Sequence, residues 1–106
     1  MTTFDKREEA FERQFVRDEE LKFKAGARRN RLLGLWVAER LGITGAQAEA
    51  YAGQLVVAEV DGGEAGVIGK VTADLERKGV ASSAEEIGAK MEELMQLAMA
   101  QVKAGV

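Results

Sequence analysis

The strongest helical pattern in this sequence is RRNRLLGLWVAERL, residues 28–41. Its apolar residues recur at intervals of three and four, which places them on one side of an α-helix. Gly42 follows directly and is a typical C-terminal stop for a helix. The stretch therefore predicts an amphipathic helix that buries one side against other helices. The residues on that side are Leu32, Leu33, Trp36, Val37 and Leu41.

The same spacing continues toward the C-terminal end and predicts two further helices as far as Gly79. Thr44 and Gln47 form a Thr-x-x-Gln capping box that opens the first of them, which is expected to end near residues 61–63. The next covers about residues 64–78, and Gly79 is its expected stop.

A last helix is expected to begin at a Ser-x-x-Glu box, either Ser82 with Glu85 or Ser83 with Glu86, and Gly105 closes it. The chain has 106 residues and no proline, which suits one compact domain, and no stretch alternates over strand length. Four amphipathic helices with short connections predict an all-α four-helix bundle over residues 19–106. Its expected apolar residues beyond position 41 are Ala48, Tyr51, Ala52, Leu55, Val67, Ile68, Val71, Leu75, Ile87, Met91, Leu94, Met95, Ala98 and Val102.

A glycine-rich stretch, residues 62–71, superficially resembles a phosphate-binding loop. Such a loop needs glycine five residues before its Gly-Lys pair and serine or threonine after it, but those positions hold Glu64 and Val71. The spacing instead favours a helix boundary with close backbone packing. No nucleotide cofactor is expected from this stretch.

Several chemistries are excluded by composition, because the chain contains no cysteine and no histidine. Disulfides, thiol nucleophiles and imidazole general bases are absent, and no metal site or catalytic residue is expected. Acidic residues often occur as adjacent pairs, but the two side chains of each pair point about 100° apart on a helix. They therefore do not converge into an acid–base pair. The longest largely apolar run, residues 32–38, is far too short to span a bilayer, and we expect a cytoplasmic, non-enzymatic protein.

Basic residues gather toward the N-terminal third of the chain. Residues 1–31 hold nine lysines and arginines against seven acidic residues, although the whole chain has a net charge of −3 and a pI near 5.1. The basic cluster comprises Lys22, Lys24, Arg28, Arg29 and Arg31. It lacks aromatic residues interleaved at a spacing for base stacking, and the net charge of the chain argues against nucleic-acid binding. One hypothesis is nevertheless a small helical module that recognises nucleotide or nucleic acid through this cluster. The candidate phosphate contacts are Lys24, Arg28, Arg29 and Arg31.

All four phenylalanines lie within residues 4–23, in a segment that is otherwise rich in charge. On a helix, Phe4, Phe11 and Phe15 fall within about 40° of one another and form a narrow aromatic seam. A core helix normally has an apolar face at least ~100° wide, whereas a narrow seam suits insertion into a groove of another protein. The pattern therefore favours a partner-binding arm over a fifth core helix, and residues 3–15 are expected to be frayed or disordered when unbound.

Four stretches of the sequence resemble a known protein family: FDKREEAFER at 4–13, DEELKFKA at 18–25, ARRNRLLGLW at 27–36 and KMEEL at 90–94. They resemble the zeta-subunit family, the small ATPase-inhibitor proteins of the F-type ATP synthase in alphaproteobacteria. The resemblance is strongest over the first 41 residues.

The resemblance implies a four-helix bundle with an N-terminal inhibitory arm, here about residues 1–18. This arm would enter a catalytic α/β interface of the synthase head and approach the γ stalk. It implies a protein without a cofactor, peripheral to the inner membrane through the synthase. Weak binding of ATP or ADP by the bundle is compatible with this role. Carried over by position, the arm's partner contacts are Phe4, Lys6, Arg7, Glu8, Phe11, Arg13, Phe15 and Arg17.

Overall fold

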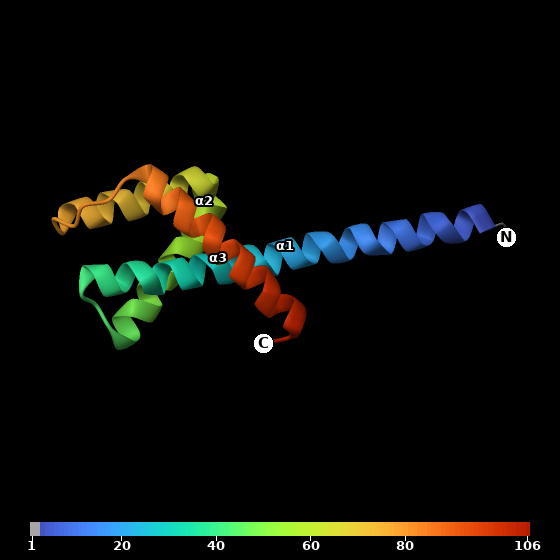
Figure 1. The fold of residues 1–106 in the computed structure, drawn as a ribbon, viewed down its shortest axis with the longest axis horizontal. Helices are drawn as coiled ribbons and strands as arrows, with labels where there is room; N and C mark the ends of the chain where they lie inside the picture. The colour runs from blue at the N-terminus through green and yellow to red at the C-terminus, as the bar shows by residue number, and fades with distance from the viewer. Residues whose placement is uncertain (1–2) are drawn as a thin grey trace.

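The computed structural model describes the backbone of residues 3–106 and the side chains of residues 10, 12–13 and 17–106. Three helices follow one another along the chain: α1 (Thr3–Leu41), α2 (Gly45–Arg77) and α3 (Ala84–Ala104) (Figure 1). No strand occurs in the described part, so the all-α prediction is confirmed. Within that part, no helix combines the length and apolar character needed to cross a lipid bilayer.

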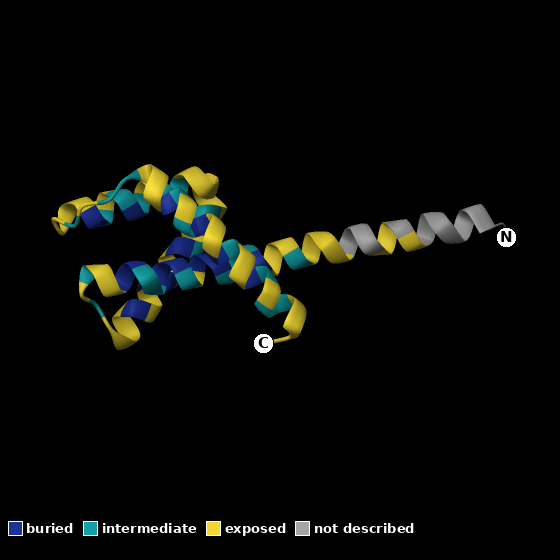
Figure 2. Ribbon diagram, in the orientation of Figure 1, coloured by how far each residue is buried: buried dark blue, intermediate teal, exposed yellow. Residues whose placement is uncertain are grey.

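Helix α1 is 39 residues long, and its two halves are packed differently. Its C-terminal half lies between α2 and α3, whereas its N-terminal half leaves the bundle and accounts for the elongated shape, 64 × 25 × 21 Å (Figure 1). Ala25 is the first buried residue among the described side chains (Figure 2). The helix passes residue 18 without a break, and the proposed division into arm and bundle at that point stays a prediction.

Helix α2 folds back at Gly63, where the backbone leaves the helical region with φ 67° and ψ −162°. Its two segments lie against each other, because the Tyr51 hydroxyl donates to Asp74 Oδ2 at 2.8 Å. A straight helix would separate these residues by ~34 Å. The prediction of four helices is therefore wrong, since the structure has three. The expected boundary near residues 61–63 is present as a kink at Gly63, which joins two helical segments into the single element α2.

The glycine-rich stretch builds this reversal of direction. Gly63 takes a positive φ that other residues rarely adopt. At Gly66 a Cβ atom would lie 3.0 Å from the backbone oxygen of Ala58, on the segment before the reversal. Any side chain at position 66 would force the Ala58 backbone to move by a few tenths of an ångström, so glycine favours this close approach of the two segments. The expectation of a helix boundary with close backbone packing is thus confirmed, although the boundary is a sharp bend within α2.

The helix ends follow the predicted signals with one exception. Gly42 and Gly105 directly follow α1 and α3, and Gly79 follows the C-cap residue of α2; all three have positive φ, as expected of C-terminal stops. Ser83 caps α3 and accepts a hydrogen bond from the Glu86 backbone N–H at 3.1 Å. The capping box at Thr44 is wrong: Thr44 occupies the N-cap position, but its side chain makes no capping hydrogen bond. The next residue, Gly45, has a φ of 59°, which is not the geometry of a regular first turn.

The core lies where the three helices meet, and the backbones of α1 and α2 come into close contact at Gly34. A Cβ atom on Gly34 would lie 2.5 Å from the Cα of Ala52. Small residues at the crossing therefore allow contact between the two backbones, and larger apolar side chains fill the space on either side. The buried cluster consists of Leu33, Val37, Tyr51, Leu55, Val67, Val71, Leu75, Ile87, Met91 and Leu94. All ten were predicted as core positions.

Candidate functional site

The aromatic seam lies on the N-terminal half of α1. The backbone of positions 4, 11 and 15 belongs to the helix, but the side chains of Phe4, Lys6, Arg7, Glu8, Phe11 and Phe15 lie outside the described residues. Arg13 and Arg17 are described, and both are exposed. The arm's candidate contacts are therefore placed by helical register, and their role stays a prediction.

The basic cluster is divided between two sides of α1. Lys24, Arg28 and Arg31 line one open groove, whereas Arg29 turns into the bundle and is only 4% exposed. This separation follows from helix geometry, because neighbouring residues point about 100° apart. The structure therefore does not gather the four predicted phosphate contacts at one site.

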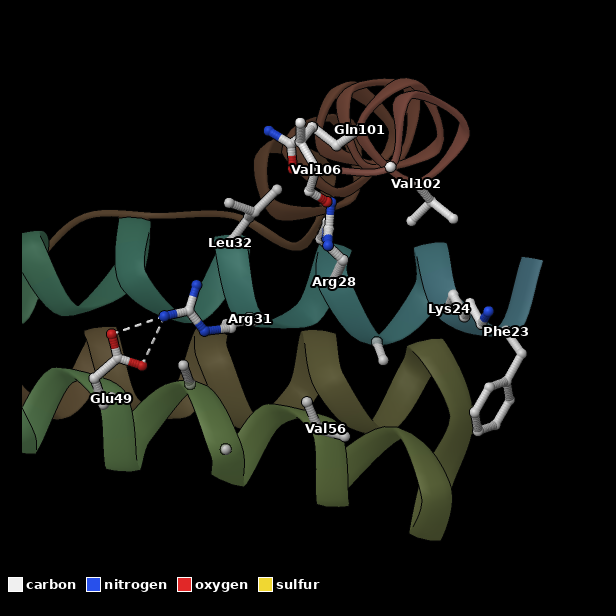
Figure 3. A pocket seen from close by; sticks show the side chains of 14 residues that line it. Phe23, Lys24, Arg28, Arg31, Leu32, Glu49, Val56, Gln101, Val102 and Val106 are labelled. Carbon is white, nitrogen blue, oxygen red and sulfur yellow. Dashed lines mark hydrogen bonds and ion pairs between the residues drawn. The ribbon is translucent and has the colours of Figure 1, made fainter. Parts of the chain in front are cut away.

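The groove lies over α1, between the first segment of α2 and the C-terminal end of α3 (Figure 3). Arg31 donates from Nη2 to both carboxylate oxygens of Glu49, at 2.9 and 3.0 Å. Arg28 points the other way and donates to the backbone oxygen of Val106. The groove has a volume of about 1020 Å³.

Apolar side chains share this groove with the cations. Phe23 lies at its outer end and is 80% exposed, and Val56 and Val102 flank it from α2 and α3 (Figure 3). The sequence pattern separated Phe23 from the aromatic seam but did not connect it with these valines. Such a groove depends on three helices meeting, so no local signal could have identified it.

On the opposite side, Arg29 is the centre of a polar cluster within the bundle. Its Nε donates to Asn30 Oδ1 at 3.2 Å, and its Nη1 donates to Glu64 Oε1 at 3.0 Å. Its Nη2 and the Asn30 amide both donate to Glu59 Oε2. Glu59 precedes the bend at Gly63 and Glu64 follows it. The buried guanidinium therefore ties the two sides of the bend to α1.

Replacing Arg29 with methionine is expected to lower the free energy of unfolding by about 1–2 kcal/mol. A fully buried pair that loses one partner costs more, but the side chains of Glu59 and Glu64 remain 32% and 68% exposed and can be rehydrated. Urea unfolding followed by circular dichroism measures the change. The control is Arg77→Met, since the Arg77 side chain is 75% exposed although it also pairs with an aspartate. Equal, small effects of the two substitutions would contradict a stabilising role for the Arg29 cluster.

A second polar cluster joins the two segments of α2 around Asp74. Besides the bond from Tyr51, Asp74 pairs with Lys70 at 3.1 Å and with Arg77. Burial pushes the pKa of Asp74 upward, but the hydrogen bonds from Tyr51 and Lys70 and the nearby positive charges outweigh it, so the net pKa lies below the ordinary value. Burial and the bond to Asp74 raise the pKa of Tyr51 well above its usual value. These bonds oppose separation of the two segments.

The lowered pKa predicts a component of stability that acid removes. Because the folded state binds the proton of Asp74 less readily than the unfolded state, this component is complete above the ordinary pKa near 4. It is lost as the pH falls through the lowered value. We expect the stability difference between the wild type and Asp74→Asn to shrink from about pH 6 to about pH 3, measured by urea unfolding. Glu76→Gln, at an exposed position, is the control. A difference independent of pH would contradict the assignment.

Among the described side chains, no group of three or more acidic, histidine or cysteine residues is arranged to hold a metal ion. The described surface thus offers a charged, partly apolar groove and a projecting helix. Both features are suited to contact with another macromolecule.

Comparisons with known proteins give a similar solved structure and a matching family. A protein whose structure was solved by solution NMR is 44% identical to this chain, with a TM-score of 0.70; the match covers 81% of this chain and 99% of that one. No curated protein matches the chain. A family model described as ATPase inhibitor subunit zeta matches residues 1–101. The chain therefore belongs to the ATPase inhibitor subunit zeta family, whose members are regulatory proteins and not enzymes.

Proposed function

We propose that this chain inhibits ATP hydrolysis by the F-type ATP synthase and that residues 1–18 are its inhibitory arm. The observation that carries the proposal is the unequal packing of α1. Its 39 residues form one helix, yet all the described side chains from residue 10 to residue 20 are exposed. A helix that leaves its own bundle is available to a groove in another protein. The family match, which includes this segment, supports the ATP synthase as the partner.

The arm would act by entering a catalytic interface between an α and a β subunit and by approaching the γ subunit. Catalytic interfaces of a rotary ATPase open and close during each turn. A helix that fits one closed state has to be expelled before rotation continues, so its binding free energy opposes the next step. This function would place the chain on the head of the synthase.

Phenylalanines are the expected anchors of the arm, because burying each contributes ~1.5–3 kcal/mol before the cost of ordering the segment is subtracted. The charged residues would set the register and orientation of the helix in the interface. The proposed contacts remain Phe4, Lys6, Arg7, Glu8, Phe11, Arg13, Phe15 and Arg17.

The test is ATP hydrolysis by the purified cognate synthase head, titrated with the full chain and with a variant that lacks residues 1–18. We expect the full chain to inhibit and the truncated chain to leave hydrolysis unchanged. Circular dichroism should show that the truncated bundle still unfolds cooperatively, since Ala25 is the first buried residue in the described part of α1. Inhibition by both proteins would move the activity to the bundle, and inhibition by neither would refute the proposal.

A further inference from the structure

The groove between α1, α2 and the end of α3 lies outside the inhibitory arm, and the proposed contacts of the arm do not account for its shape, apolar lining or charge. We propose that it is a second docking surface, and that its occupant is an acidic amphipathic helix of the partner that the arm inhibits. This inference rests on the proposed function for the identity of that partner. The shape, the apolar lining and the charge of the groove each support it.

The shape of the groove suits a helix. Ala27 on α1 and Ala52 and Gly53 on α2 contribute little side-chain volume to its lining. At Gly53 a Cβ atom would meet nothing within 4 Å, so the space above it is open. Small residues let another helix approach to the 8–10 Å interaxial distance that is typical of packed helices.

The walls of the groove provide apolar contacts. Val56 is partly buried on α2, Val102 is partly buried on α3, and Phe23 is 80% exposed at the outer end. One turn beyond Val56, Val60 lies on the same side of α2 and is 81% exposed. Aromatic and aliphatic side chains of this kind are typical anchors at protein interfaces, and they favour a protein over a nucleic acid.

The charge of the groove specifies an acidic occupant. Among the side chains of its lining are three cations, Lys24, Arg28 and Arg31, but a single acidic side chain, Glu49, which Arg31 already binds. No hydrogen bond or ion pair within the described residues engages Lys24. Arg28 donates one N–H to the backbone oxygen of Val106, and its guanidinium has further N–H groups that can donate to a partner. This local excess of positive charge stands out in a chain whose net charge is −3.

The cationic surface also continues toward the arm. Arg17, Lys24 and Arg31 are spaced seven residues apart, so they drift by only ~20° per step along one side of α1. Glu20 lies four residues before Lys24, on the same side of α1, so it offsets part of this positive charge. Because α1 is a continuous helix, a partner that binds residues 1–18 would meet the same line of cations beyond the arm. The groove is thus positioned to engage the same partner.

The first test reverses the charge of the groove. Lys24→Glu/Arg28→Glu is compared with Lys78→Glu/Lys103→Glu, which makes the same change of net charge outside the groove. We expect the groove variant to associate with the purified synthase head about tenfold more slowly at low salt, and this difference to shrink at high salt. The control should stay within about twofold of the wild type. Circular dichroism checks that both variants are folded.

The outcomes separate the two proposals. If the wild type inhibits the head and the groove variant associates at the same rate, the groove proposal is wrong and the proposed function stands. If the wild type neither binds nor inhibits the head, both fail. A defect in both double variants would indicate a non-specific charge effect and would also overturn the proposal.

A cross-linking experiment identifies the occupant directly. Gly53→Cys introduces a unique thiol, because the chain contains no cysteine, and this position tolerates a side chain. The thiol is labelled with a photoreactive maleimide, and the adduct with the synthase head is located by mass spectrometry. We expect a helical segment of the head with an excess of aspartate and glutamate. An adduct only with a second copy of this chain, with a basic segment, or with nothing while the labelled chain still inhibits would overturn the proposal.

Discussion

Replacing Gly34 with alanine is expected to lower the free energy of unfolding by about 2 kcal/mol, the net of an overpacking cost and a gain in helix propensity. The added Cβ would lie 2.5 Å from Ala52 Cα and 2.9 Å from its Cβ, so the two helix backbones would have to separate. Overpacking of a well-filled core costs ~1–3 kcal/mol and more where a backbone opposes it, which exceeds the gain of about 1 kcal/mol in helix propensity. For a chain of this size the thermal midpoint should fall by roughly 10 °C or more.

The matched control is the same substitution at Gly69, an exposed glycine in α2 where a Cβ would meet nothing within 4 Å. Only helix propensity acts there, so Gly69→Ala should stabilise the protein by up to about 1 kcal/mol. The two variants are compared by thermal and urea unfolding. A stabilising effect of Gly34→Ala would show that α1 and α2 do not approach as closely as the structure places them.

Much of the fold could be predicted because helical periodicity and glycine stops are local signals. Residues 28–41 repeat their apolar positions with the period of a helix, and α1 ends at Leu41, directly before the predicted stop at Gly42. The number of helices could not be predicted, because a glycine can end a helix or bend it. Whether Gly63 does one or the other depends on the packing of Ala58 and Gly66, which lie on opposite sides of the bend.

The candidate site was predictable only where it depends on a single helix. Helical register predicts an aromatic seam on one side of the arm, and this stays a prediction because its side chains lie outside the described residues. The basic cluster was treated as one group, although the 100° step between Arg28 and Arg29 already implies different sides. That Arg29 would be buried could not be inferred, because Glu59 and Glu64 come near it only through the bend in α2. The groove likewise requires Val56 and Val102 from two other helices.

Replacing Phe11 with alanine is expected to raise the concentration of chain needed for half-maximal inhibition of ATP hydrolysis about 10- to 100-fold. Phe11 is the central member of the predicted seam, and losing ~1.5–3 kcal/mol of buried aromatic surface corresponds to this range. The bundle should unfold at an unchanged temperature, because the buried residues of the described part of α1 begin only at Ala25.

Glu12→Ala, at an exposed neighbouring position outside the proposed contacts, should change inhibition less than about threefold. Full inhibition by Phe11→Ala would mean that the seam does not anchor the arm. A lowered unfolding temperature would instead mean that Phe11 belongs to the bundle.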